Sequence, residues 1–371
     1  MNVERLHSIA LALRDDLSRS SVTSHLQQLV SALQNQINQP GQPTYQQQVS
    51  QFYEALRSAL ESSEVNAFSP TWRQVLDEIG AAPLLGLELD ARVTEIFSRN
   101  QITPSVALQE LQTILTEIQA LSTSIDQMLA AFRQLKIGSE ALPAGDCEVG
   151  ILIPRIFVDN RLDKFSEELG ELNQIFGVFA EVATGGRPSF GIRAISSSDL
   201  SIFLDTAPVI GACVAVAIER IIALYKQLLE IRKLQGELAK QGLEKDNLKG
   251  IEKHANGLME QGIDKLVKEL LADFHKVDDN GRKNELSIEL KYALKKVANR
   301  VDRGFNIEVR MTEPEATEPE ADEQENAASK EATRHHVRIA AAAETLQFLK
   351  LEGEPILSLT EEKTERAKKA S

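Results

Sequence analysis

The residue types that could do chemistry are a glycine pair followed by arginine, an acidic turn, a histidine pair and a serine run. Gly185-Gly186-Arg187 could hold a phosphate, because glycine lets backbone amides approach an anion and arginine adds a positive charge. Neither a Walker lysine nor a dinucleotide-binding fingerprint accompanies these residues. A simple turn between a helix and a strand is therefore the favoured interpretation.

The acidic turn, Asp278-Asp279-Asn280-Gly281, has the composition of a calcium-binding loop without its ligand spacing. If Gly281 takes the sixth position of such a loop, Lys276 stands where an acid is required. Ser287 then stands where the bidentate glutamate belongs. Two of the required carboxylate ligands are absent, so a solvated turn is predicted.

The histidines and serines do not form a reactive cluster in the sequence either. His335 and His336 are adjacent and point in different directions on a helix, whereas metal chelation by one helix needs a spacing of three or four. A surface pair is predicted. Ser197-Ser198-Asp199 has no histidine nearby for a hydrolase triad. We therefore predict no catalytic residue, no cofactor and no metal. An enzyme whose residues meet only in three dimensions is kept as an alternative.

Composition favours a helical protein in a reducing compartment. The 371 residues are 42% hydrophobic but only 5% aromatic, and the apolar residues recur at helical spacing. The net charge of −14 argues against binding to nucleic acid. Two cysteines are too few for a disulfide framework, so a cytoplasmic location is expected.

Cations gather along one predicted helix near the C-terminal end of the folded part. A solvated face is the favoured interpretation of this row, and nucleic acid is disfavoured because only Tyr292 supplies an aromatic ring. A sharper hypothesis is that the acidic stretch 313–325 folds back over it, because the two are close in sequence and opposite in charge. The cations are Lys291, Lys295, Lys296, Arg300 and Arg303.

Two long apolar seams dominate the predicted architecture. Apolar residues step by three and four along residues 207–240 and again along residues 104–137, which is typical of helices that pack along their length. The stretch 145–206 between them predicts a strand, a helix and a hairpin. The expected fold is mainly α: an elongated helical bundle with a long antiparallel coiled-coil hairpin that carries a small inserted α+β tip module.

The same patterns divide the chain into seven expected parts. These are an N-terminal helical bundle (1–103), coiled-coil arm 1 (104–144), the inserted tip module (145–206), coiled-coil arm 2 (207–244), C-terminal body helices and a strand (245–311), a disordered acidic linker (312–327), and a C-terminal helix with a docking segment (328–371). Cys213 is expected to be buried where stalk and tip meet. Glu230, Arg232 and Lys233 are expected to face outward from the second half of the helix over 207–240. The helix over 104–137 is expected to end at Gly138, since glycine commonly takes the left-handed cap.

The apolar stretch near the C-terminus is the predicted interaction site. Such apolar content after an acidic linker indicates docking, either onto the chain's own body, beside the strand 305–310, or onto a partner protein. The predicted partner-binding residues are Phe348, Leu349, Leu351, Ile356, Leu357 and Leu359.

These features predict a non-enzymatic coiled-coil interaction or scaffold protein whose tip module and C-terminal segment bind protein partners. A homodimer is one expectation, because coiled seams are often completed by a second copy, and an intramolecular hairpin that satisfies both seams is the alternative. The first alternative is a membrane-active protein, because long helices around a short β insert are similar in layout to the α-helical pore-forming toxins. Residues 207–218 would start the inserting helix, but Arg193, Asp199 and Asp205 make insertion costly and disfavour a membrane.

Overall fold

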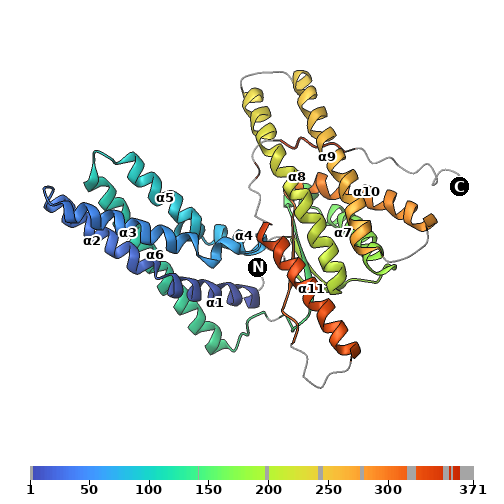
Figure 1. Ribbon diagram of the computed structural model, residues 1–371, viewed down its shortest axis with the longest axis horizontal. Coiled ribbons are helices and arrows are strands. Elements are labelled where there is room, and N and C mark those ends of the chain that lie inside the picture. Colours follow the sequence, from blue (N-terminus) through green and yellow to red (C-terminus); the bar gives the residue numbers. More distant parts are fainter. Residues whose placement is uncertain are drawn as a thin grey trace. The chain divides into compact units, whose positions relative to one another are not determined.

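The computed structural model is mainly helical (Figure 1). The residues that it describes contain a single four-stranded sheet. Those residues are 3–140, 142–196, 200–240, 245–275, 280–315, 323–345, 351 and 354–359. The chain separates into two compact units. The first contains residues 1–68 and 72–141, and the second contains residues 69–71 and 142–371.

The first unit is a helical bundle whose longest member is α6. Proline stands at the first position of both α3 and α6, where its missing amide proton costs nothing. The helices of this bundle are α1 (Val3–Ser20), α2 (Val22–Asn38), α3 (Pro43–Glu61), α4 (Pro70–Glu78), α5 (Gly86–Arg99) and α6 (Pro104–Leu135), although the first two residues of α4 group with the second unit.

Helix α6 takes part in two separate hydrophobic cores of this unit. Its first half packs with α2, α3 and α5, through residues that include Leu111 and Ile118. Its second half packs with α1 and α4, through residues that include Ile125 and Leu129. The predicted apolar seam is therefore buried, but by the helices of its own bundle.

The second unit combines a sheet with five helices around one core. Its strands lie in the order β2-β3-β1-β4, and every neighbouring pair is antiparallel. Its elements are β1 (Cys147–Ile153), α7 (Leu162–Thr184), β2 (Gly191–Ser196), β3 (Leu200–Thr206), α8 (Pro208–Lys240), α9 (Lys245–Phe274), α10 (Asn280–Asp302), β4 (Asn306–Met311) and α11 (Glu323–Thr345).

Strand β1 is buried along its whole length because both faces of the sheet are covered at this position. Val149 and Ile151 point into the core that α8 shares. On the other face Glu148 accepts a hydrogen bond from Arg310 at 2.8 Å. Position 150 requires glycine, because a Cβ there would overlap the side chains of Phe203 and Glu308. Alternation along the strand thus places apolar side chains on one face and the Glu148 carboxylate on the other.

Helix α8 crosses the centre of the second unit, and it packs against α7, α9, α10, α11 and β4. Cys213 has no exposed surface, as expected for the apolar first half of the helix. Glu230 and Lys233 face outward as predicted. Arg232, which was expected on the same outward face, is instead buried, because Asp302 of α10 provides a carboxylate for it inside the unit.

The strand, helix and hairpin of the insert are confirmed, but the arrangement around them differs from the expected tip. Strand β4 joins β1 in the same sheet, and α7 packs on α8 and α10, so residues 145–206 share a core with 207–311. Arm 1 groups with the first unit and arm 2 with the second. The coiled-coil pairing of α6 with α8 is not confirmed, since each seam is buried within its own unit.

Two element boundaries also differ from the predictions. Helix α6 ends at Leu135, where Lys136 takes the left-handed backbone conformation that was expected of Gly138. Helix α11 begins at Glu323, so residues 323–327 of the predicted acidic linker are helical. Residues 316–322 of that linker lie outside the described part of the chain.

Candidate functional site

The predicted C-terminal interaction segment packs against the second unit of its own chain. Ile356, Leu357 and Leu359 are buried in the core of that unit, and Leu351 packs against it while partly exposed. Phe348 and Leu349 lie outside the described residues. We call residues 354–359 the tail segment. Its expected place beside the strand 305–310 is wrong, because its hydrogen bonds go to side chains of α9 and α10.

Four consecutive backbone amides of the tail segment are bound by side chains. Asp302 Oδ2 accepts hydrogen bonds from the amides of Ile356 at 2.8 Å and Leu357 at 2.7 Å. Asn256 Oδ1 accepts from the amide of Ser358 at 2.8 Å. The fourth amide, that of residue 359, donates to Asn299 Oδ1 at 3.2 Å. The segment is therefore recognised through its main chain from two helices.

Both asparagines also donate to the tail segment. Asn256 Nδ2 donates to the carbonyl of Ile356 at 3.3 Å, and Asn299 Nδ2 donates to the carbonyl of Leu359 at 3.2 Å. An asparagine amide that accepts and donates in this way replaces the backbone of a neighbouring strand. It satisfies polar groups that burial would otherwise leave without water.

Asp302 is the centre of a buried network that joins the tail segment to α8. Its Oδ1 accepts hydrogen bonds from the Tyr225 hydroxyl at 2.6 Å and from Arg232 at 2.9 Å. Arg232 also donates to the main-chain carbonyl of Asp302 at 2.6 Å. Asp302 and Tyr225 are 0% exposed and Arg232 is 5% exposed. Burial, and next the neighbouring Asp302 carboxylate, raise the pKa of Tyr225 well above its ordinary value, so this hydroxyl remains a donor.

We call Tyr225, Arg232, Asn256, Asn299 and Asp302 the tail-docking site. Helix geometry brings Asn299 and Asp302 to one face of α10, because they are three residues apart. Asp302 also ends the helix, where the helix dipole disfavours a negative charge. That unfavourable placement is a sequence signal that favours a hydrogen-bonding or cationic partner for Asp302.

The cationic row of α10 belongs to the same unit and is paired with acids of α7 and α9. Arg300 forms a buried bidentate ion pair with Glu168, with N–O distances of 2.6 and 2.9 Å. Lys295 contacts Glu260 at 2.7 Å, and both Lys295 and Arg300 are buried. The predicted solvated face is therefore wrong for these two side chains, because acids of the neighbouring helices α7 and α9 pair with them. The alternative hypothesis, that the acidic stretch folds back over the row, stays a prediction.

The other candidate sites from the sequence, where the structure describes them, take part in the packing of the fold. Gly185 ends α7 with a φ of 77°, and Arg187 pairs with Glu181 at 2.6 Å, so the arginine already has a carboxylate partner. His335 is 8% exposed, so the predicted surface pair is wrong for this residue, which faces the unit's interior. Residues 276–279 and 197–199 lie outside the described part of the chain.

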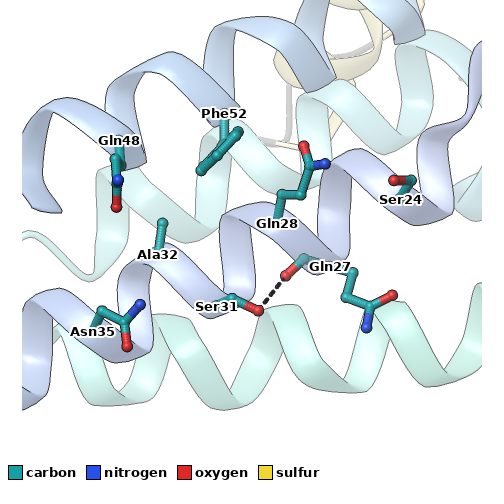
Figure 2. Close-up of a pocket in the computed structure, with 8 residues that line it drawn as sticks. All are labelled: Ser24, Gln27, Gln28, Ser31, Ala32, Asn35, Gln48 and Phe52. Atoms are coloured by element: carbon teal, nitrogen blue, oxygen red, sulfur yellow. Dashed lines mark hydrogen bonds between the residues drawn. The ribbon is translucent and has the colours of Figure 1, made fainter.

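Two hollows were not predicted. One, of about 480 Å³, lies between α2 and α3 in the first unit, and Figure 2 shows amide and hydroxyl side chains around it with Phe52 as its aromatic ring. None of its lining residues is charged; they are Ser24, Gln27, Gln28, Ser31, Ala32, Asn35, Gln48 and Phe52. The other, of about 400 Å³, lies beside β2 in the second unit. Its Arg193 contacts Asp205 at 2.5 Å and Asp146 at 3.0 Å, so its charges are largely matched.

The described residues contain no cluster of metal ligands and one helix of membrane-spanning length. No group of three or more histidine, cysteine, aspartate or glutamate side chains among them could hold a metal ion. One helical stretch, Pro208–Glu237, is long and apolar enough to cross a membrane, and 61% of its most apolar window is buried inside the protein. Core helices share that length and composition, so the finding is weak evidence for a membrane span.

Comparison with protein-family models, curated proteins and solved structures gave no match. The contacts of the chain itself are therefore the basis for assigning a function. Among the described residues, the tail-docking site is the place where burial, charge and directed hydrogen bonds converge on a peptide segment.

Proposed function

We propose that this chain is a non-enzymatic interaction protein that binds extended peptide segments at the tail-docking site. Its own tail segment occupies the site in the structure, and a partner protein presents a competing segment. The observation that supports this proposal is the binding of four consecutive tail amides by Asp302, Asn256 and Asn299. Main-chain contacts of this kind give affinity in many peptide-recognition sites, while pockets for side chains give specificity.

The site has partners that hold it in place without the tail segment. Arg232 and Tyr225 contact Asp302 through the oxygen that the tail does not use. Loss of the tail would therefore leave the carboxylate paired and oriented. A site that is already organised binds a peptide with a smaller ordering cost.

The partner is proposed to be a protein in the cytoplasm. Cys147 and Cys213 are both free thiols, which supports a reducing compartment. A second copy of the chain carries the same tail segment and is one such partner, so a homodimer by tail exchange belongs to this proposal.

The test releases the tail segment in the full-length chain. In the Ile356→Asp/Leu357→Asp variant, two charges would have to enter the core, so the segment should leave the site. A fluorescently labelled peptide with the sequence of residues 351–359 should then bind this variant and not the unchanged chain. Fluorescence anisotropy measures the binding. The matched control is Ser358→Asp, which adds a charge at an exposed position of the same segment and should leave the site occupied.

Two results would count against the proposal. One is a folded released variant, by circular dichroism, that does not bind the peptide. The other comes from hydrogen exchange in the unchanged chain, which does not depend on a variant. The amides of residues 356–359 should exchange faster than those of β1, because tail release is smaller than unfolding of the unit. Equal protection of both would mean that the tail leaves only when the unit unfolds.

A second candidate function is membrane activity, which the apolar stretch Pro208–Glu237 favours. In that case part of α8 would leave the core and enter lipid. Release of a dye from liposomes of varied lipid composition and pH measures this activity. Absence of both binding and leakage under all conditions would remove this candidate.

A further inference from the structure

We infer that the tail-docking site selects an internal peptide segment with four consecutive free amides and the side-chain pattern aliphatic, aliphatic, any residue, aliphatic. This inference rests on the proposed function and names its ligand class. The tail segment supplies the pattern as Ile356-Leu357-Ser358-Leu359.

The requirement for free amides comes from the acceptors around the segment. The amides of Ile356, Leu357 and Ser358 each donate to a side chain of α9 or α10, and so does the amide that follows them. Proline has no amide proton, so it is excluded from all four positions. It is allowed immediately before them, where Pro355 stands and where no amide is used.

The requirement for aliphatic side chains comes from burial. Ile356, Leu357 and Leu359 are 2%, 4% and 4% exposed, and all three belong to the core of the second unit. Ser358 is exposed. The third position of the pattern therefore tolerates any side chain that keeps the amide, whereas a polar residue at the other three would be buried without a partner.

The segment does not need a free chain end. The sequence continues for a further stretch after Leu359, and the contacts to Asn299 use both the amide and the carbonyl of that residue. Asn299 therefore binds the amide and the carbonyl of a residue inside the chain, and it has no contact that requires a terminal carboxylate. Ligands are expected within loops or tails of partner proteins as well as at their ends.

The test compares labelled peptides that differ at one group, using the tail-released full-length chain. In the first, the amide that precedes Ser358 is replaced by an ester, which removes one N–H and keeps the side chains. Loss of one hydrogen bond should weaken binding about fivefold to tenfold. The Ser358→Ala peptide is the control and should bind within about twofold. A Ser358→Pro peptide should bind more weakly than the ester.

A variant of Asn256 tests whether this residue is the acceptor for the Ser358 amide. In the protein, Asn256→Ala removes both the acceptor for the Ser358 amide and the donor to the Ile356 carbonyl, so it should weaken binding of the unmodified peptide. It should weaken binding of the ester peptide less, because only the contact to the Ile356 carbonyl is left to lose. A general loss of structure would weaken both peptides equally. Equal effects on the two peptides would overturn the assignment of Asn256.

The outcomes separate this inference from the function on which it rests. If the unmodified peptide binds but the ester and proline peptides bind equally well, the ligand pattern is wrong and the peptide-binding function stands. If the released variant does not fold, the comparison is made in the intact chain, where Ser358→Pro should lower the melting temperature and Ser358→Ala should not. Equal melting temperatures would again overturn the pattern.

Discussion

Replacement of Asp302 by asparagine tests the network that joins α8, α10 and the tail segment. The carboxylate accepts from two tail amides through one oxygen, and from Tyr225 and Arg232 through the other. Asparagine keeps the shape but has only one oxygen. Whichever way its amide turns, its NH₂ group faces two donors, so two buried donors lose their acceptor.

The expected loss of stability follows from the burial of the ion pair. Removal of one partner of a buried pair costs about 3–5 kcal/mol, mostly because the other charge is left without compensation. Arg232 still donates to the main-chain carbonyl of residue 302, so the lower end, about 3 kcal/mol, is expected. A loss of that size raises the population of the unfolded second unit roughly a hundredfold.

Hydrogen exchange followed by mass spectrometry is the suitable assay, because it follows β1 and the tail segment separately. Exchange in β1 reports unfolding of the second unit, and exchange in residues 354–359 reports release of the tail. The matched control is Asp264→Asn. Its pair with Lys291 is 2.5 Å long but has side chains that are 52% and 38% exposed, and such pairs contribute about 0–1 kcal/mol.

The reasoning is refuted if Asp302→Asn accelerates exchange in β1 no more than Asp264→Asn does. Faster exchange of the tail amides alone, with β1 unchanged, would show that Asp302 holds the tail but does not stabilise the unit. That result would leave the peptide site intact and remove the contribution assigned to the pair with Arg232.

Other contacts of the second unit give three more predictions. Gly211→Ala should destabilise the unit by about 1–3 kcal/mol, because the added Cβ overlaps the Cys147 sulfur. Thermal unfolding should show that Gly211→Ala/Cys147→Ala recovers part of this loss. An equal loss of stability with or without the sulfur would contradict the steric cause. Burial is the main cause, and neighbouring carboxylates the second, that raise the pKa of the Cys147 thiol to about 12. Iodoacetamide should therefore modify this thiol only after unfolding. Rapid labelling of the native chain, measured by mass spectrometry, would disprove this prediction. Burial raises the pKa of Glu181, but hydrogen bonds from Arg282 and Arg187 outweigh burial and hold that pKa below its ordinary value. The resulting stabilisation is present above the ordinary pKa and lost as pH falls through the lowered one, so Glu181→Gln should flatten the decline of the melting temperature in acid, and an unchanged decline would be inconsistent with this linkage.

Local patterns in the sequence were sufficient to predict most elements. Steps of three and four identified α6 and α8, and short apolar runs identified β1, β2, β3 and β4, because side-chain periodicity follows directly from backbone geometry. The same patterns could not identify the partners of each seam. An apolar seam shows that a helix face is buried, but any apolar surface of suitable shape can bury it.

The tail-docking site was predictable in part. The apolar residues of the C-terminal stretch indicated docking, and Ile356, Leu357 and Leu359 are indeed buried. The side chains that bind its backbone were missed. Arg232 was expected to face solvent because its carboxylate partner is 70 residues away in the sequence, and an isolated asparagine such as Asn256 has no spacing that indicates a peptide acceptor.

The position of β1 inside the sheet has a consequence for synthesis. Its partner on one side is β4, and Arg310 lies 162 residues after Glu148, which it contacts. At about 5–20 residues per second, a ribosome needs roughly 10–30 s to make the chain between them. During that interval β1 has an unpaired edge and several apolar side chains, a combination that favours aggregation. The nascent chain should therefore depend on chaperones until β4 has left the ribosome.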